Sequence, residues 1–251
     1  MMTEKTQPQK TSPEATNPFL TTGSHIGTVY KTGDMKRYIF KRRKDGLLVL
    51  NVENIEERLK IAAEFIAQFP ADRVVIVARR LYGQLPARKF AEIIGAKALT
   101  GRFIPGTFSN KEHKKFIEPK VVLVTEPEAD LQAIKEASIV RAPVVAFVST
   151  NNSLRNVDLA IPMNNKGRKS LALAFYTLTR EYLVKHKDIK NVDGFSLSPE
   201  DFEYKLATPT GEEDPVKQAI IEGRQLRRKR FGGHGRGKDD GDRPRMGRKG
   251  P

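Results

Sequence analysis

The chain has 251 residues, of which 38% are hydrophobic and 30% charged, and its formal net charge at pH 7 is +15. It contains no cysteine, which excludes disulfides, thiolate zinc sites and cysteine nucleophiles and favours an intracellular setting. No apolar run approaches the length of a membrane span, and the first residues lack the apolar stretch of a signal peptide, so neither a membrane partner nor secretion is expected.

The two ends of the chain differ in composition from its middle. Residues 1–18 are rich in Thr, Gln, Pro and Lys, and residues 223–251 are rich in Arg, Lys and Gly with almost no apolar side chain. Neither segment can bury a core, so both are predicted to be disordered tails. Between them we expect a globular domain at 19–187 and a surface-wrapping extension at 188–222, where the helical signal is weak and turn residues are frequent.

Between the tails, short apolar runs alternate with segments of helical periodicity. The runs show no polar alternation and lie at 47–50, 74–77, 121–124, 144–148 and 159–161. The helical segments lie at 55–66, 81–94, 131–138 and 171–182. Such runs suit strands that are buried on both faces, and interleaved helices suit right-handed βαβ connections. The pattern predicts an α/β fold, a three-layer sandwich of about five parallel strands, with an edge strand or hairpin at 38–40 before the first of them.

Polar residues follow each predicted strand, at 51–54, 79–80, 125–128, 149–152 and 164–167. Open α/β sheets bind ligands at the carboxyl ends of their strands, so an enzyme that binds a nucleotide or sugar phosphate there is one hypothesis. Local structure offers another explanation. Asn54 and Glu57 have the spacing of a helix capping box, and Thr125 and Glu128 have the same spacing. Asn and Ser clusters are common in turns, so we favour caps and turns over catalysis.

The inventory of catalytic side chains is thin. The histidines show no carboxylate or second histidine at metal-ligand spacing; they are His25, His113, His186 and His234. The segment 22–27 lacks the GxGxxG and GxxxxGK patterns of nucleotide-binding loops, and it is read as a tight turn or an RNA backbone contact. No nucleophile elbow of the form GxSxG is present. We therefore predict no catalytic residue, no metal ligand, no cofactor and no small-molecule substrate.

Positive charge is concentrated in two places, which points to a nucleic-acid partner. Residues 224–251 hold eleven cations and three acids, and the cations include Arg227, Arg228, Lys229 and Arg230. Residues 31–44 hold seven cations and one acid, and the cations include Lys31, Lys36, Arg37, Lys41, Arg42 and Arg43. Cations at this density neutralise phosphates and release condensed counterions. The basic tail is expected to become ordered when it lies along RNA.

Aromatic residues and further cations extend this hypothesis. Tyr30, Tyr38 and Phe40 are interleaved with the cations at 31–44, and they either stack on unpaired bases or belong to the core. Further candidate RNA contacts follow predicted strands or open the last helix: Arg79, Arg80, Arg102, Lys166, Arg168 and Lys169. Aromatic RNP motifs and a helix-turn-helix signal are absent from the sequence, so we expect recognition of folded RNA by shape and backbone.

Several sequence blocks stand out between the two tails of the chain. They are GSHIG at 23–27, MKRYIF at 35–40, GLLVL at 46–50, GRFIPGTFSN at 101–110, AIKEA at 133–137, PVVA at 143–146, NVD at 156–158 and IPMNNKGRK at 161–169. In their wording, order and spacing these blocks resemble the small-subunit ribosomal protein S2 family. The resemblance implies a flavodoxin-like sheet and a non-enzymatic, structural place in the small ribosomal subunit in the cytoplasm, in contact with ribosomal RNA and neighbouring ribosomal proteins.

Two details resemble the archaeal and eukaryotic branch of that family, which includes the SA or laminin-receptor-precursor proteins. Bacterial members carry a long helical hairpin after the GTxxN block, whereas only ten residues separate Asn110 from Val121 here. The block at 161–169 is also similar to archaeal and eukaryotic members. The Arg/Gly-rich tail departs from the shorter archaeal pattern, so the resemblance does not identify its partner. A cell-surface or scaffold role, which the SA name suggests, is not expected without a signal peptide.

Overall fold

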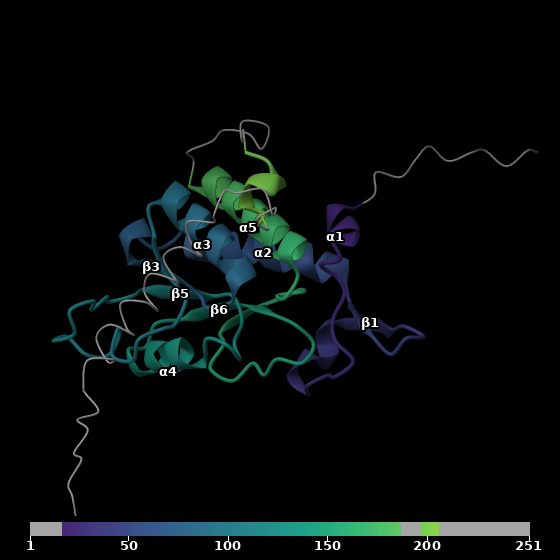
Figure 1. The fold of residues 1–251 in the computed structure, drawn as a ribbon, viewed down its shortest axis with the longest axis horizontal. Helices are drawn as coiled ribbons and strands as arrows, with labels where there is room; N and C mark the ends of the chain where they lie inside the picture. The colour runs from purple at the N-terminus through teal and green to yellow at the C-terminus, as the bar shows by residue number, and fades with distance from the viewer. Residues whose placement is uncertain (1–16, 187–196, 206–251) are drawn as a thin grey trace, which may run out of the picture. The chain divides into compact units, whose positions relative to one another are not determined.

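The computed structural model describes residues 17–186 and 197–205, and its centre is a parallel sheet (Figure 1). The sheet has five strands in the order β4-β3-β5-β6-β7. They are β3 (Val74–Ala78), β4 (Lys97–Thr100), β5 (Val121–Val124), β6 (Val144–Val148) and β7 (Leu159–Pro162). Every residue of β3, β5 and β6 is buried, as expected of strands that are covered on both faces. The predicted α/β fold with about five parallel strands is confirmed.

Helices cover the two faces of the sheet unequally (Figure 1). Three helices pack on one face: α2 (Val52–Ile66), α3 (Leu81–Ile94) and α5 (Arg168–Lys185). Phe90 and Phe175 lie at the centre of their contact with the sheet, with ring centroids 5.9 Å apart. On the other face, α4 (Leu131–Ile139) packs beside the loop residues Phe103 and Phe108. These layers form the expected three-layer, flavodoxin-like sandwich.

The run at 47–50 does not join the parallel sheet. It forms β2 (Leu48–Leu50), which pairs antiparallel with β1 (Ile39–Arg42) in a separate two-stranded sheet. The predicted hairpin is therefore present, but the expectation that 47–50 is a strand of the central sheet is wrong. The fifth parallel strand is β4, at the sheet edge, where Lys97 is exposed and the next three residues are half-buried. A short edge strand of this kind lacks the continuous apolar run that marks a central strand.

The helix starts differ from the predicted capping boxes. α2 begins after Asn51, whose side-chain oxygen accepts a hydrogen bond from the Glu53 amide (3.1 Å), so Asn54 lies inside the helix. α4 begins after Asp130, and Thr125 donates its hydroxyl to Asp130 Oδ2 (3.3 Å) instead of capping the helix. Both predicted caps are wrong, because the spacing of two residues does not by itself determine where a helix begins.

Short helical turns complete the described residues: α1 (Pro18–Thr21), η1 (Asp34–Tyr38), η2 (Ala71–Arg73) and η4 (Pro199–Phe202). η4 packs on α5, where Phe202 is fully buried and its ring lies 6.2 Å from that of Tyr176. It belongs to the predicted extension at 188–222, whose boundaries stay predictions. The predicted tails lie outside the described residues, apart from residues 17 and 18. Across residues 17–186 and 197–205, no helix has both the length and the apolar character that crossing a bilayer requires.

Candidate nucleic-acid interface

The carboxyl ends of the parallel strands bring several of the predicted cations to one edge of the sheet. Arg79 and Arg80 follow β3, Arg102 lies just beyond β4, and Lys166 lies between β7 and α5. Because parallel strands all end at the same edge, residues that are far apart in the sequence meet there. The arginines are exposed and Lys166 is half-buried, so all of them are accessible from outside the sheet.

Residues 23–34 cross the carboxyl ends of β6 and β7 and fill the space above them. The Thr28 amide donates to Thr150 Oγ1, 2.8 Å away, just beyond the end of β6. The Asn164 amide, just beyond β7, donates to the carbonyl of Ser24 over 2.8 Å. The chain itself therefore occupies the region above these two strands in which an α/β enzyme would hold a ligand.

The block at 23–27 folds as the predicted tight turn. Gly23 has φ +69°, a left-handed conformation that suits glycine, and its carbonyl accepts from the Ile26 amide (3.2 Å). His25 is half-buried, and its Nδ1 lies 3.3 Å from the carbonyl oxygen of Phe19. The histidine is thus held by the backbone of α1, which gives it a structural role in the turn.

The strand order reverses between β3 and β5, which is where open α/β sheets usually bind ligands. Here Arg80, after β3, forms an ion pair with the fully buried carboxylate of Glu126, after β5. Gly83, in the first turn of α3, faces Thr125: a Cβ at position 83 would be in ordinary van der Waals contact with the threonine side chain, at 3.5 Å. The chain's own side chains fill this crevice, so the structure does not favour the nucleotide- or sugar-phosphate-binding enzyme.

Asp130 is a buried carboxyl beside the same crevice. It is 1% exposed, and its Oδ2 accepts the Thr125 hydroxyl. Burial raises the pKa of the Asp130 carboxyl to about 6, although the Thr125 hydrogen bond and the charges of Arg79 and Arg80 act in the opposite direction. Shifted pKa values mark catalytic groups when they face a cleft, whereas Asp130 is enclosed at the start of α4. We assign it a structural role.

Residues 31–44, which we call the basic segment, expose all seven of their cations. Two arginines have partners within the hairpin: Arg42 Nε donates to the Gly46 carbonyl (3.1 Å), and Arg43 forms an exposed ion pair with Asp45 (3.3 Å). An exposed pair of this kind is weak and exchanges readily for a phosphate. The remaining cations form no ion pair with a carboxylate of the described residues: Lys31, Lys36, Arg37, Lys41 and Lys44.

The aromatic residues in the basic segment, together with Tyr30 just before it, divide between base stacking and the core. Tyr38 is 4% exposed and belongs to the core beside Met35, whereas Phe40 is 68% exposed and Tyr30 is 79% exposed. The ammonium of Lys41 lies 5.7 Å from the centroid of the Phe40 ring. Phe40 and Tyr30 are therefore accessible for stacking on bases, and Tyr38 is not.

A hollow of about 610 Å³, which we call the Phe40 hollow, lies between the hairpin, α1 and the start of α2. Leu20, His25 and Phe40 give it apolar and ring surfaces, and its charged lining consists of Lys41, Arg43 and the acid Glu53. An unstacked base rests on such surfaces while cations hold its phosphates. The arrangement suits a single nucleotide turned out of folded RNA.

The predicted cations at the start of α5 have different surroundings. Arg168 Nε pairs with Glu203 Oε1 over 2.8 Å, which ties the helix to the segment after η4. Asn164 Oδ1 accepts from the amides of Lys166 and Gly167, both at 3.1 Å, so these amides are already satisfied. Lys169 is exposed. Arg168 therefore ties α5 to the residues after η4. A role in RNA binding for Arg168, Lys166 and Lys169 stays a prediction.

A buried carboxylate supports the loop between β4 and β5. Glu136 of α4 is 2% exposed, and its carboxylate accepts hydrogen bonds from the amides of Gly106 (2.8 Å) and Phe108 (3.1 Å). Gln132 and Ser109 donate to it as well, at 2.9 and 3.3 Å. Burial alone would raise the pKa of Glu136, but these hydrogen bonds outweigh it and lower the pKa. Glu136 is thus a buried charged side chain that helps to hold the block at 101–110 in place.

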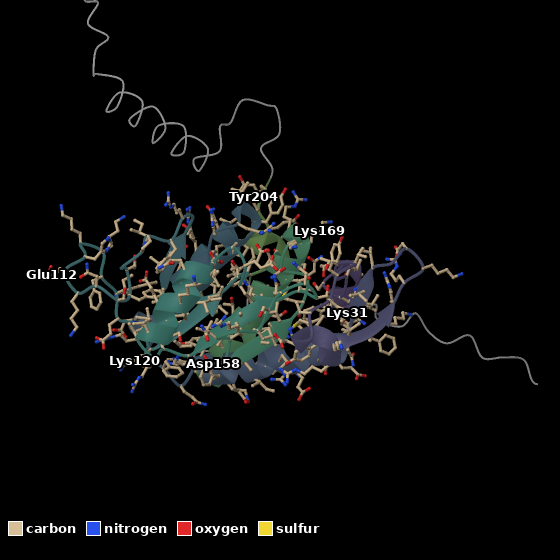
Figure 2. The ribbon with its side chains drawn as sticks, turned by 90° about the horizontal axis from the view of Figure 1, so that it is seen from below. Lys31, Glu112, Lys120, Asp158, Lys169 and Tyr204 are labelled. Carbon is tan, nitrogen blue, oxygen red and sulfur yellow. The ribbon has the colours of Figure 1, made fainter. Side chains whose placement is uncertain are left out.

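The loop that Glu136 supports carries cations that the sequence analysis did not single out. Lys111, Lys114, Lys115 and Lys120 are exposed, and Glu112 accompanies them. Figure 2 shows Glu112 at one end of the described body and Lys31 well away from it on the other side, so this loop is separate from the basic segment. The run KEHKK at 111–115 is the sequence signal for it, and four cations in ten residues are fewer than in the basic segment.

Two further predictions concern metal ligands and the cations of the C-terminal tail, and the structure bears on them only for the residues that it describes. Among residues 17–186 and 197–205, no group of three or more His, Cys, Asp or Glu side chains is arranged to hold a metal ion. The tail cations Arg227, Arg228, Lys229 and Arg230 lie outside the described residues. Their contact with RNA stays a prediction.

A comparison with known families supports the resemblance seen in the sequence. The family model described as Ribosomal protein S2 matches residues 113–183. This range is less than half of the chain and holds β5, α4, β6, β7 and most of α5, together with the last four of the blocks quoted above. The basic segment lies outside the matched range, so its role rests on its charge and geometry.

Proposed function

We propose that this protein is a structural constituent of the small ribosomal subunit in the cytoplasm, and that it binds ribosomal RNA through backbone and shape contacts. In this role it supports subunit assembly and translation and has neighbouring ribosomal proteins as further partners. The family match at 113–183 supports the place in the small subunit. The ten residues between Asn110 and Val121 leave no room for a long helical hairpin, which supports the archaeal and eukaryotic type. The proposal includes no catalytic step and no cofactor.

The observation that carries RNA binding is the exposed charge of the basic segment. Its seven cations are all exposed. Two nearby acids, Asp34 and Asp45, are engaged by the Leu154 amide and by Arg43, and Glu53, which lines the Phe40 hollow, forms no ion pair among the described residues. Cations without carboxylate partners attract a polyanion over distances comparable to the Debye length, about 8–10 Å at physiological salt. Phe40 and its hollow then add a surface for stacking, which a purely solubilising charge would not need.

Incorporation into the subunit tests this proposal. We expect the double variant R42E/R43E, in the full chain, to fold normally but to enter small subunits poorly, because it places two negative charges where phosphates would bind. Sedimentation of cell lysates through sucrose gradients at low and high salt measures the fraction of protein in the particle. The matched control is K60E/K97E, which changes the charge equally at exposed lysines of α2 and β4 outside the basic segment.

The outcomes separate the hypotheses. Loss of incorporation for R42E/R43E, with the control behaving as the wild type, supports the basic segment as an RNA contact. Equal incorporation of both variants and the wild type contradicts that role. A wild-type protein that stays free of ribosomal particles at every salt concentration, or that binds a nucleotide or sugar phosphate when free of RNA, contradicts the proposed function itself.

A further inference from the structure

A second hollow, of about 620 Å³, brings together cations from three parts of the chain. Lys36 and Arg37 belong to η1, Arg58 to α2, and Arg155 to the loop between β6 and β7. Tyr38 lines the same hollow, which we call the Tyr38 pocket. Lys36 and Arg37 are among the cations predicted from the sequence, whereas nothing in the local sequence pattern marks Arg58 or Arg155.

The positive charge of this pocket is not balanced from within. Two carboxylates line it, and each already accepts a backbone hydrogen bond: Asp34 Oδ2 from the Leu154 amide (3.1 Å), and Asp158 Oδ2, labelled in Figure 2, from the Val144 amide (2.8 Å). None of the four cations forms an ion pair with a carboxylate among residues 17–186 and 197–205. Repulsion among cations that share one space is relieved when an anion binds between them.

Tyr38 gives a second, independent indication that this pocket suits an anion. Its ring is 4% exposed, and the guanidinium carbons of Arg37 and Arg58 lie 4.8 and 5.8 Å from the ring centroid. The aromatic ring thus holds two like charges near each other. The Tyr38 hydroxyl is buried and has no hydrogen-bond partner among the described residues, although a buried tyrosine hydroxyl usually has one.

We infer that the Tyr38 pocket binds the phosphate of one nucleotide of the ribosomal RNA, an inference that rests on the proposed function. The guanidinium groups of Arg58 and Arg155 donate to the phosphate oxygens, and Lys36 adds a third positive charge. A phosphate oxygen is also the acceptor that the Tyr38 hydroxyl lacks. Arginine suits this role because its planar fork can donate two parallel hydrogen bonds to a phosphate.

The size of the pocket agrees with a nucleotide. Small-molecule sites usually enclose about 300–1,000 Å³, so a hollow of about 620 Å³ has room for a sugar and base beside the phosphate. The pocket also differs in character from the Phe40 hollow, where apolar rings accompany the cations. We therefore assign phosphate binding to the Tyr38 pocket and base stacking to the Phe40 hollow.

Binding of full-length protein to small-subunit ribosomal RNA, stripped of its proteins, tests the inference. The double variant R58Q/R155Q should bind this RNA about tenfold more weakly or worse. A plot of log K against log salt concentration should be shallower by about one for this variant, because the pocket holds one phosphate and each lost phosphate contact removes about one unit of slope. The control K60Q/R88Q removes two exposed cations from outside the pocket and should leave both quantities unchanged.

Two further measurements keep the test independent of folding. Y38F removes only the unpartnered hydroxyl, so it should leave the thermal unfolding midpoint unchanged or higher while weakening RNA binding several-fold. Phenylglyoxal, which modifies arginine, should react with Arg58 and Arg155 in the free protein and less when RNA is bound, as mass spectrometry would show. A purely structural role for Tyr38 and these arginines predicts neither result.

The possible outcomes distinguish the pocket inference from the proposed function. If R58Q/R155Q and Y38F bind the RNA as the wild type does, while R42E/R43E binds weakly, the pocket inference is overturned and the proposed function stands. If the wild type shows no salt-dependent RNA binding, the proposed function fails and the inference fails with it. Adenosine monophosphate and inorganic phosphate are the remaining probes. Micromolar binding of either to the wild type, lost in R58Q/R155Q without any change in RNA binding, overturns the assignment to RNA.

Discussion

Gly27 packs directly against Thr150: a Cβ at position 27 would stand 2.8 Å from the threonine hydroxyl oxygen and still closer to its methyl carbon. The same Cβ would lie 3.1 Å from the Leu48 carbonyl oxygen. These contacts bring residues 23–34, the β1–β2 hairpin and the end of β6 together at one point. A glycine at this position is therefore required by close approach, since its φ does not lie in the left-handed region.

We expect Gly27→Ala to destabilise the fold by about 1–3 kcal/mol, the usual cost of overpacking a close contact. Urea unfolding followed by circular dichroism measures the loss. Thr150→Ser removes the methyl group and keeps the hydroxyl that accepts the Thr28 amide, so G27A/T150S should recover part of the stability. If G27A has the same unfolding free energy as the wild type, residues 23–34 must relax away from β6 at no cost, and the close contact is not required.

The carboxylate of Glu136 gives a second prediction. Glu136→Ala leaves the amides of Gly106 and Phe108 without their acceptor inside the protein, and it should cost about 2–4 kcal/mol. Glu112→Ala, in the exposed part of the same loop, is the matched control and should change the unfolding free energy by less than about 0.5 kcal/mol.

The pH dependence of Glu136 follows from its lowered pKa. Because the folded state lowers the pKa below the ordinary 4.5, the carboxylate stabilises the fold above that pH, and this contribution is lost as the pH falls through the folded pKa. The difference in unfolding free energy between the wild type and E136Q should therefore shrink on acidification. A difference that stays constant from neutral to strongly acid pH would contradict the role of the charged form.

The sequence predicts the central strands well because burial on both faces leaves a clear composition. β3, β5 and β6 are runs of Val, Ile, Leu, Ala and Phe, and all their residues are buried. The same composition misleads at 48–50, since β2 is equally apolar but pairs with β1 and, through a bridge at Val49, with Ile26 instead of joining the parallel sheet. A local pattern reports how deeply a segment is buried, whereas its partner strand depends on the rest of the chain.

Local sequence patterns are limited in the same way at the candidate RNA-binding site. Tyr38 and Phe40 are two positions apart, and a continuous strand would place both on one face. Tyr38 instead ends η1, and β1 begins at Ile39, so one ring enters the core and the other is exposed. Arg58 and Arg155 meet in the Tyr38 pocket from elements far apart in the sequence, so only the tertiary structure brings them together.

Asp130 gives a prediction of opposite sign to that of Glu136. Burial raises its pKa from 3.8 to about 6, so the folded state favours the protonated form. Its effect therefore makes the fold less stable as the pH rises from about 4 to above 6, because the unfolded state releases the proton more easily. At pH 7 the ionised carboxylate is an energetic cost to the fold, and a neutral side chain of the same shape should relieve it.

We expect Asp130→Asn to raise the unfolding free energy at pH 7 by about 1–3 kcal/mol, the order that a rise of the Asp130 pKa from 3.8 to about 6 implies. The amide oxygen of Asn can still accept the Thr125 hydroxyl. The gain should shrink toward zero as the pH falls to about 4, where Asp130 is protonated in the folded state. Glu92→Gln, at an exposed acid of α3, is the control, and a lower stability of D130N at pH 7 would show that the charged form is needed.

Phe40 separates a binding role from a structural one. Because its ring is 68% exposed, Phe40→Ala should change the unfolding free energy by less than about 0.5 kcal/mol. Stacking of one base on an aromatic ring contributes about 1–3 kcal/mol, so the same variant should bind the ribosomal RNA about five- to a hundredfold more weakly, as measured by filter binding. Ile139→Ala removes a similarly exposed apolar side chain, 69% exposed, from α4 and should leave RNA binding unchanged.

The salt dependence of RNA binding should be the same for F40A as for the wild type, because the ring carries no charge. This result would distinguish F40A from R42E/R43E. Wild-type affinity of F40A would assign the exposed ring to a contact with a neighbouring protein instead of a base.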